Sequence, residues 1–61
     1  MPKISIKAAR VNAGLTQSEA ARRLGINPDT LASYERKSNK LTLEMLKKMA
    51  ELYRIPAEFL K

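Results

Sequence analysis

The chain has 61 residues, of which 44% are hydrophobic, and twelve lysines and arginines against six acidic residues give it a formal net charge of +6. A chain of this length buries only about 60% of its unfolded surface, so it can form one domain with one modest core over residues 1–61. It contains no cysteine and no histidine, which removes disulfides, thiolate nucleophiles, the usual zinc ligands and the ordinary general base.

Several classes of function are excluded by what the chain lacks. Its serine hydroxyls have no histidine to activate them and it has no glycine-rich phosphate loop, so we expect no enzyme, metal, cofactor or small-molecule substrate. The apolar runs are far too short for a membrane span or a signal sequence. The lack of disulfides favours a cytoplasmic location, and the excess positive charge favours a polyanionic partner.

A first helix is predicted to begin after Ser5, whose hydroxyl can cap the first amides, and to end at Gly14. Ile6 and Arg10 fall on one face of this helix, which directs Arg10 inward. Residues 1–10 contain three basic side chains and no acidic one.

Thr16 and Glu19 have the spacing of a capping box, which predicts a second helix from Gln17 to Leu24. Gly25 stands where a left-handed residue ends a helix. The next helix begins almost at once.

Asn27 is predicted to cap a third helix in which Pro28 is the first residue and Arg36 is close to the last. Only residues 25–27 connect it to the helix over residues 17–24. Two helices joined by three or four residues form a helix-turn-helix unit, whose second helix can enter the major groove of DNA.

The helix over residues 28–36 separates an apolar face from a wholly polar one. If Leu31 points inward, Tyr34 and Glu35 lie within about 60° of it. The side chains that project the opposite way are Asp29, Thr30, Ser33, Arg36 and Lys37. A solvated face would look the same on an arbitrary amphipathic helix, but the short turn and the basic segments on either side favour DNA.

Glu35 lies beside the apolar stripe, where an unpaired carboxylate would be costly. Arg10, on the inward face of the first helix, is its predicted bidentate partner. The alternative is two solvated charges that never meet.

The remainder of the chain is also predicted to be helical, which makes the fold class all-α. Residues 37–41 form a basic loop, Thr42 caps a core helix over residues 43–53, and Pro56 suits the first turn of a short fifth helix. Apolar side chains cover one broad face of the core helix, at Met45, Leu46, Met49, Ala50, Leu52 and Tyr53.

These residues resemble the lambda-repressor-like, Cro/C1-type helix-turn-helix family, also called the XRE family, over nearly the whole chain. Residues 14–21 match the family's "GLTQxELA" opening, with Ala20 where leucine is commoner. The segments that follow at the family's spacings are Gly25-Ile26, Leu31-x-x-Tyr34-Glu35, Thr42-Leu43-x-x-Leu46-x-x-Met49-Ala50 and Ile55-Pro56-x-x-Phe59-Leu60.

The resemblance implies a compact five-helix domain, bacterial or phage-encoded, in which the second and third helices form the helix-turn-helix. It implies binding to double-stranded, pseudo-palindromic operator DNA as a two-fold dimer, with the helix over residues 28–36 in the major groove. Half-sites about 34 Å apart require a dimer. We expect a weak homodimer formed through the C-terminal end, with Ile55, Phe59 and Leu60 as the candidate contacts.

The site residues implied by the resemblance divide into three sets. The base-facing positions are Asn27, Pro28, Asp29, Thr30 and Ser33. The phosphate-contacting positions are Gln17, Arg10, Arg36, Lys37, Ser38 and Lys40. The resemblance also implies that Gln17 supports the helix over residues 28–36. Arg10 and Glu35 match a buried structural ion pair.

The chain departs from the family at Lys37 and Arg54, where glycine is often found. A residue other than glycine in a left-handed conformation costs on the order of 1 kcal/mol, so we expect these helix ends to differ in detail.

The leading hypothesis is a sequence-specific transcriptional regulator that represses by occupying an operator. The alternative is an antitoxin or restriction-controller type protein, whose main partner is another protein and which also binds its own operator. Its candidate surface is Leu52, Tyr53, Ile55, Phe59 and Leu60, for which core packing or self-association is the other interpretation. RNA binding is weaker because three aromatics offer no stacking platform, and a membrane-surface helix is weaker because Glu44 and Glu51 interleave with Lys47 and Lys48.

Overall fold

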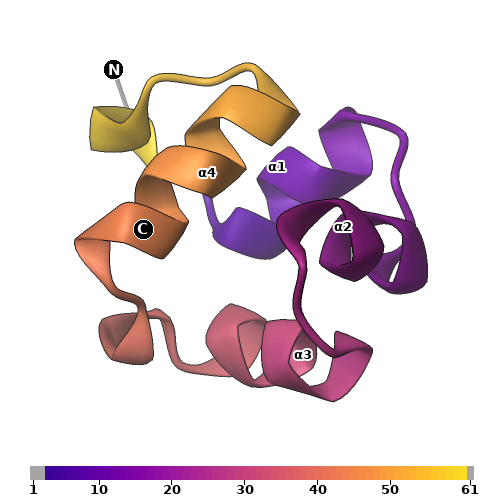
Figure 1. The fold of residues 1–61 in the computed structure, drawn as a ribbon. Coiled ribbons are helices and arrows are strands. Elements are labelled where there is room, and N and C mark those ends of the chain that lie inside the picture. The colour runs from indigo at the N-terminus through magenta and orange to yellow at the C-terminus, as the bar shows by residue number, and fades with distance from the viewer. Residues whose placement is uncertain (1–2, 61) are drawn as a thin grey trace.

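The computed structural model describes residues 3–60, which fold almost entirely as helices. Figure 1 shows α3 along the lower edge of the molecule, with α4, α1 and α2 above it from left to right. The elements are, in chain order, α1 (Ile6–Asn12), α2 (Gln17–Leu24), α3 (Pro28–Arg36), a 3-10 helix (Ser38–Lys40), α4 (Leu43–Tyr53) and a second 3-10 helix (Ala57–Phe59).

The helices begin where the sequence predicts, because each has a side chain that satisfies a free backbone amide. Ser5, Thr16, Asn27 and Thr42 each accept a hydrogen bond from an amide in the first turn of the helix that follows. The predicted capping box is confirmed, and the hydrogen bonds that Glu19 accepts from Thr16 hold the pKa of that carboxyl below its usual value.

The turn between α2 and α3 is made by a left-handed glycine. Gly25 has φ +75°, and the next amide, that of Ile26, donates to the carbonyl of Ala21 at 2.9 Å. Glycine reaches this conformation without steric cost, so α2 ends abruptly and α3 begins three residues later. The helix-turn-helix geometry therefore follows from local chemistry.

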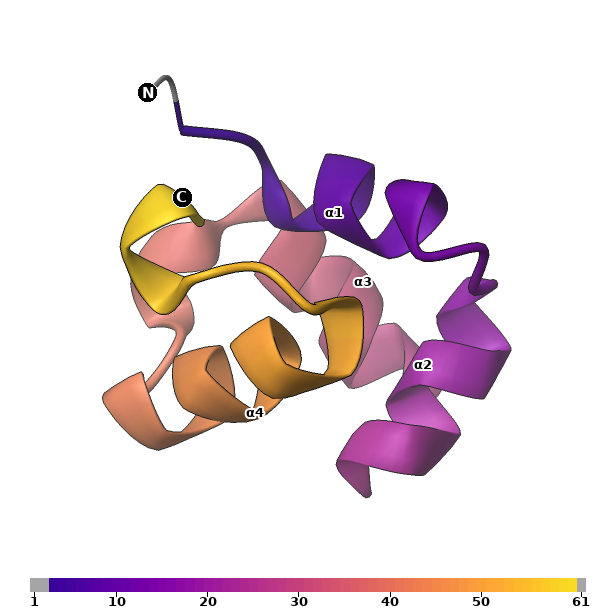
Figure 2. The ribbon, with the colours of Figure 1, turned by 90° about the horizontal axis from the view of Figure 1, so that it is seen from above.

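The prediction of a fifth α-helix is wrong, because that segment forms a short 3-10 helix. Among the described residues there are four α-helices, and the segment after Pro56 makes a single 3-10 turn, Ala57–Phe59, with no side-chain cap. The chain then extends, and the amide of Ile4 donates to the carbonyl of Phe59 at 2.8 Å in an isolated parallel bridge that pairs Ile4 with Leu60. This pairing brings the start and the end of the described chain to one side of the molecule (Figure 2).

The core draws on all four α-helices and on the C-terminal segment. Ala20 and Ala21 are fully buried, which lets α2 lie close to its neighbours. The other buried apolar residues are Ile6, Ala9, Leu24, Leu31, Met49, Tyr53 and Leu60. Each of these elements therefore helps to fix the position of α3 through the shared core.

The two expected departures at helix ends have different outcomes. Lys37, the C-cap of α3, has φ −134° and avoids the left-handed region altogether. Arg54, the C-cap of α4, has φ 56° and ψ 48°, and is the one residue other than glycine with positive φ in the described chain. Strain from a left-handed Cβ is therefore confined to Arg54.

We predict that Arg54→Gly raises the free energy of unfolding by about 0.5–1 kcal/mol. Relief of left-handed strain of about 1–2 kcal/mol exceeds the extra unfolded-state entropy of glycine, about 0.5–1 kcal/mol. Urea unfolding measures the change. Arg54→Ala is the control, because it removes the charge but keeps the strained Cβ; a glycine variant no more stable than the alanine variant would contradict the prediction.

Candidate nucleic-acid interface

The outer face of α3 is polar and open to solvent. Asn27, Pro28 and Asp29 are exposed at its start, while Thr30 and Ser33 are half-buried further along. The Asn27 side chain is partly occupied, since its Oδ1 accepts from the amide of Asp29 at 3.0 Å. All five predicted base-facing residues therefore belong to one helix and its cap, but they differ in how far they reach solvent.

Basic side chains gather at the other end of α3. Arg36, Lys37 and Lys40 are exposed, and together with Ser33 they line a hollow of about 280 Å³. The side chain of Ser38, a predicted phosphate contact, lies outside what the structure describes. This end of α3 and the following 3-10 helix form a continuous basic border to the polar face.

Behind the polar face, α3 is tied to α1 by the ion pair of Arg10 and Glu35. Arg10 Nε donates to Glu35 Oε2 at 2.7 Å and Arg10 Nη2 donates to Glu35 Oε1 at 3.3 Å. The two side chains are 9% and 4% exposed, respectively. The contact is bidentate and largely removed from solvent, so the loss of either partner would leave the other charge buried and unpaired.

Two further hydrogen bonds extend this pair into a network. Arg10 Nη1 donates to the carbonyl of Leu15 at 2.9 Å, and Gln17 Nε2 donates to Glu35 Oε1 at 2.9 Å. The network therefore joins α1, the entry to α2, and α3. The bond between Gln17 and Glu35 agrees with the support of α3 that the family resemblance implies for Gln17, although helical periodicity gives no signal for it because the two residues lie on different helices.

The predicted phosphate contact of Arg10 does not agree with its position. All three guanidinium nitrogens of Arg10 donate inside the protein, and the residue is 7% exposed. With three N–H groups bonded inside the protein and little surface exposed, the position of Arg10 fits the predicted structural ion pair better than a phosphate contact.

Tyr53 of α4 lies close enough to this network to respond to its charges. Burial raises the pKa of Tyr53 to about 12, with a further increase from Glu35 and an opposing effect from Arg10. Its buried Oη has no hydrogen-bond partner among the described residues. The phenol is therefore neutral at physiological pH and contributes as packing.

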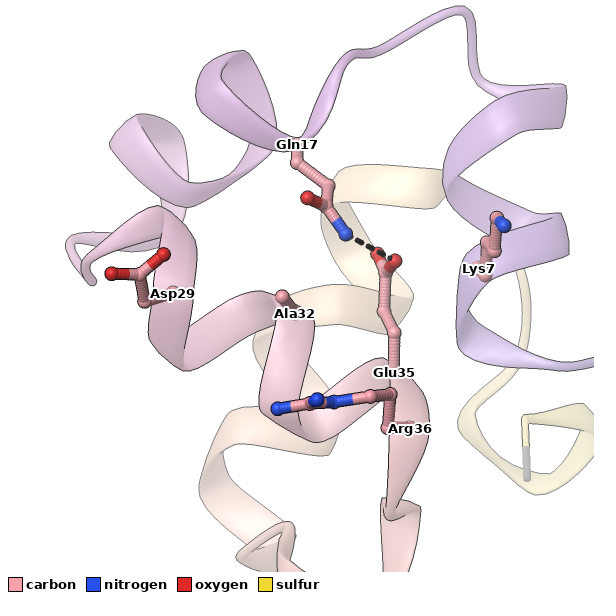
Figure 3. A pocket seen from close by; sticks show the side chains of 6 residues that line it. All are labelled: Lys7, Gln17, Asp29, Ala32, Glu35 and Arg36. Atoms are coloured by element: carbon pink, nitrogen blue, oxygen red, sulfur yellow. Dashed lines mark hydrogen bonds between the residues drawn. The ribbon is translucent and has the colours of Figure 1, made fainter.

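A hollow of about 450 Å³ opens beside the network, between α1 and α3 (Figure 3). In Figure 3 Glu35, hydrogen-bonded to Gln17, lies between Lys7 on α1 and Asp29 at the start of α3, and the Arg36 guanidinium is turned toward the Asp29 side, away from Lys7. Ala32 completes the lining. Lys7 is absent from the residues that the sequence assigns to DNA, because its distance from α3 becomes small only in the folded chain.

The C-terminal residues considered for partner contacts differ in exposure. Tyr53 is 6% exposed on the core face of α4, and Leu60, paired with Ile4 in the bridge, is 4% exposed, so both belong to the core. Ile55 and Phe59 are half-buried. The large apolar side chains that do project into solvent are Val11 and Leu43, 57% and 66% exposed.

The described helices are short. The longest, α4, has 11 residues, and none is long and apolar enough to cross a membrane.

We predict that Arg10→Met lowers the free energy of unfolding by about 3–5 kcal/mol, because it leaves Glu35 buried without its cation. The double variant Arg10→Met with Glu35→Leu should lose less stability than the single variant, since neither charge remains. Urea unfolding measures both, and circular dichroism reports whether the single variant folds. Lys47→Met, at an exposed site on α4, is the control and should change stability by less than about 0.5 kcal/mol. Equal losses in the single and double variants would show that the buried charge is not the cause.

Comparison with known proteins agrees with this geometry. Residues 6–60 match the helix-turn-helix family model. The chain is also 38% identical over 55 residues to the HTH-type transcriptional regulator ImmR of Bacillus subtilis (strain 168), a match that covers 90% of the chain but 43% of that protein. No solved structure gives a significant match. With a family match across all four α-helices and a left-handed glycine turn between the second and third, the chain belongs to the Cro/C1-type helix-turn-helix family.

Proposed function

We propose that this chain is the DNA-binding part of a sequence-specific transcriptional regulator, and that it represses by occupying an operator with α3 in the major groove. The observation that carries the proposal is the outer face of α3, which is polar over its whole length and anchored from behind by Arg10 and Glu35. In helix-turn-helix proteins the second helix of the unit contacts base edges. A protein can discriminate among base sequences only if this helix is held rigidly in place.

The matched relative supports the same assignment. Its name describes a transcriptional regulator, and the shared 55 residues include the whole helix-turn-helix unit. The chain spans 43% of the length of that protein, so the similarity concerns this part of it.

Different residues would contact the bases and the DNA backbone. Asp29 can accept a hydrogen bond from cytosine N4, and the methyl group of Thr30 can contact the methyl group of thymine. Ser33 is compatible with any base. Gln17, the basic residues at the end of α3 and Lys40 would contact phosphates, which set the position of the protein without reading sequence.

We predict that selection from random duplexes yields one preferred sequence with two half-sites. If a dimer neutralises roughly eight phosphates, log affinity for this site falls with log salt concentration at a slope of about −7. Thr30→Ala combined with Ser33→Ala should change the selected bases while retaining the salt slope, because neither residue is charged. A flat salt response, or no preference among duplexes, would remove the proposed function.

The protein is expected to form a weak dimer that DNA strengthens. Two half-sites about 34 Å apart require two copies of α3, and Ile55 and Phe59, which are half-buried, are the predicted contacts that retain exposure. Sedimentation of the free protein should give mainly monomer at micromolar concentration, and sedimentation on the selected palindrome should give two chains per duplex. A tight dimer without DNA, or one chain per palindrome, would contradict this expectation.

A further inference from the structure

Two arginines lie away from α3, where the C-terminal ends of α1 and α4 lie beside α2. Arg23 of α2 and Arg54, the C-cap of α4, line a pocket of about 440 Å³ there, which we name the arginine pocket. We propose that the arginine pocket binds an acidic segment of a partner protein through the carboxylates of that segment. The other residues of its lining are Asn12, Ala13, Leu15, Leu52 and Tyr53.

The charges around the arginine pocket favour a carboxylate ligand. Among the described residues its lining has two arginines and no acidic side chain. The C-terminal ends of α1 and α4 add partial negative charges of at most about half a unit each, which leaves an excess of about one positive unit. Glu51 borders Arg23 in a neighbouring hollow, but Lys48 lines that hollow too. Glu19, one turn before Arg23, is also within electrostatic reach of Arg22.

Both guanidiniums have N–H groups available for a ligand. Arg23 and Arg54 are exposed, and neither takes part in an ion pair within the part of the chain that the structure describes. A guanidinium is a planar fork that binds a carboxylate through two parallel hydrogen bonds. Leu15 and Leu52 are half-buried in the wall of the pocket, where they can contact an apolar side chain next to the acidic one. The arginine pocket therefore fits a short segment that combines acidic and apolar residues.

The backbone conformation of Arg54 is an independent reason to assign a role to its side chain. Arg54 is the one residue other than glycine with positive φ in the described chain. Glycine would end α4 in the same way without the strain of a left-handed Cβ. Strained residues of this kind cluster at functional sites, where the side chain has a use that compensates for the strain. Here the side chain supplies one of the two cations of the arginine pocket.

The position of the arginine pocket favours a protein partner over DNA. Figure 1 shows the C-terminal ends of α1 and α4 on the upper side of the molecule and α3 along the lower edge. In Figure 2, seen from above, these ends and α2 face the viewer, and α3 lies behind them. A duplex on the outer face of α3 would therefore leave the arginine pocket open to solvent. The proposed partner can bind there while the chain occupies DNA, so this inference goes beyond the proposed function.

The test uses a terminally blocked octapeptide, Gly-Ser-Glu-Leu-Glu-Gly-Ser-Gly, and a control peptide in which glutamine replaces both glutamates. The acidic peptide should shift the Nε–H resonances of Arg23 and Arg54 until they saturate. The glutamine peptide should bind at least about fivefold more weakly, because it cannot form ion pairs with the two guanidiniums.

The variants Arg23→Gln and Arg54→Gly should each weaken binding of the acidic peptide about threefold to fivefold, the range of ion pairs at a protein surface. Arg54→Gly relieves backbone strain, so its loss of binding would not be a loss of folding. The matched control is Arg22→Gln, which removes an exposed arginine of α2 that does not line the pocket and should leave the affinity unchanged.

Other results would overturn the inference. Equal affinity for the two peptides, no saturable shift at Arg23 and Arg54, or an equal effect of Arg22→Gln would show that the pocket does not recognise an acidic segment. Sodium acetate that binds as tightly as the acidic peptide would indicate a site for small anions only. A DNA duplex that displaces the peptide would assign the pocket to nucleic acid.

A second copy of the chain is the remaining occupant to separate from a partner protein. If the same resonances shift with protein concentration alone, and sedimentation gives a dimer, the face is a contact between copies and the inference is overturned. None of these measurements requires operator DNA, so their failure would leave the proposed function standing.

Discussion

The buried pair of Arg10 and Glu35 is the interaction on which the geometry of this molecule depends. It joins the first helix to the third, and the added bonds to Leu15 and Gln17 bring in the entry to the second. A chain of this size has a small core and a total stability of only several kcal/mol, so a bidentate buried pair is a large part of what defines the relative position of its helices. Two apolar residues could pack as well in that place, but they would not fix direction.

Directional bonding suits a helix that must present one face to a partner. The apolar residues of α3, of which Leu31 is fully buried, hold it against the core but allow it to rotate or slide slightly. Two hydrogen bonds to Glu35 from α1 and one from α2 restrict that freedom. The polar face between Asn27 and Ser33 is therefore held in one orientation, which is the condition for discriminating among base pairs.

The basic residues of α1 differ in whether they belong to this network. Arg10 is withdrawn from solvent, whereas Lys7, one turn earlier on the same helix, remains exposed beside the hollow. The basic N-terminal segment thus contains one residue that is buried in an ion pair and another that stays in solvent. Composition and net charge do not distinguish them, because the difference lies in which side of α1 each residue occupies.

The sequence by itself determined the features whose causes lie within a few residues of each other. These are the four caps, the left-handed turn at Gly25, the bounds of α2, α3 and α4, and the polar face of α3. Even the partnership of Arg10 with Glu35 could be predicted, because an acidic residue beside an apolar stripe requires a cation. Only the tertiary structure decided the rest: Glu35 as the partner of Gln17, the position of Lys7 beside α3, and the burial of Leu60. The last turn also became a 3-10 helix that leads into a bridge with Ile4. Each of these depends on contacts between segments far apart in the chain, which local propensity and periodicity do not encode.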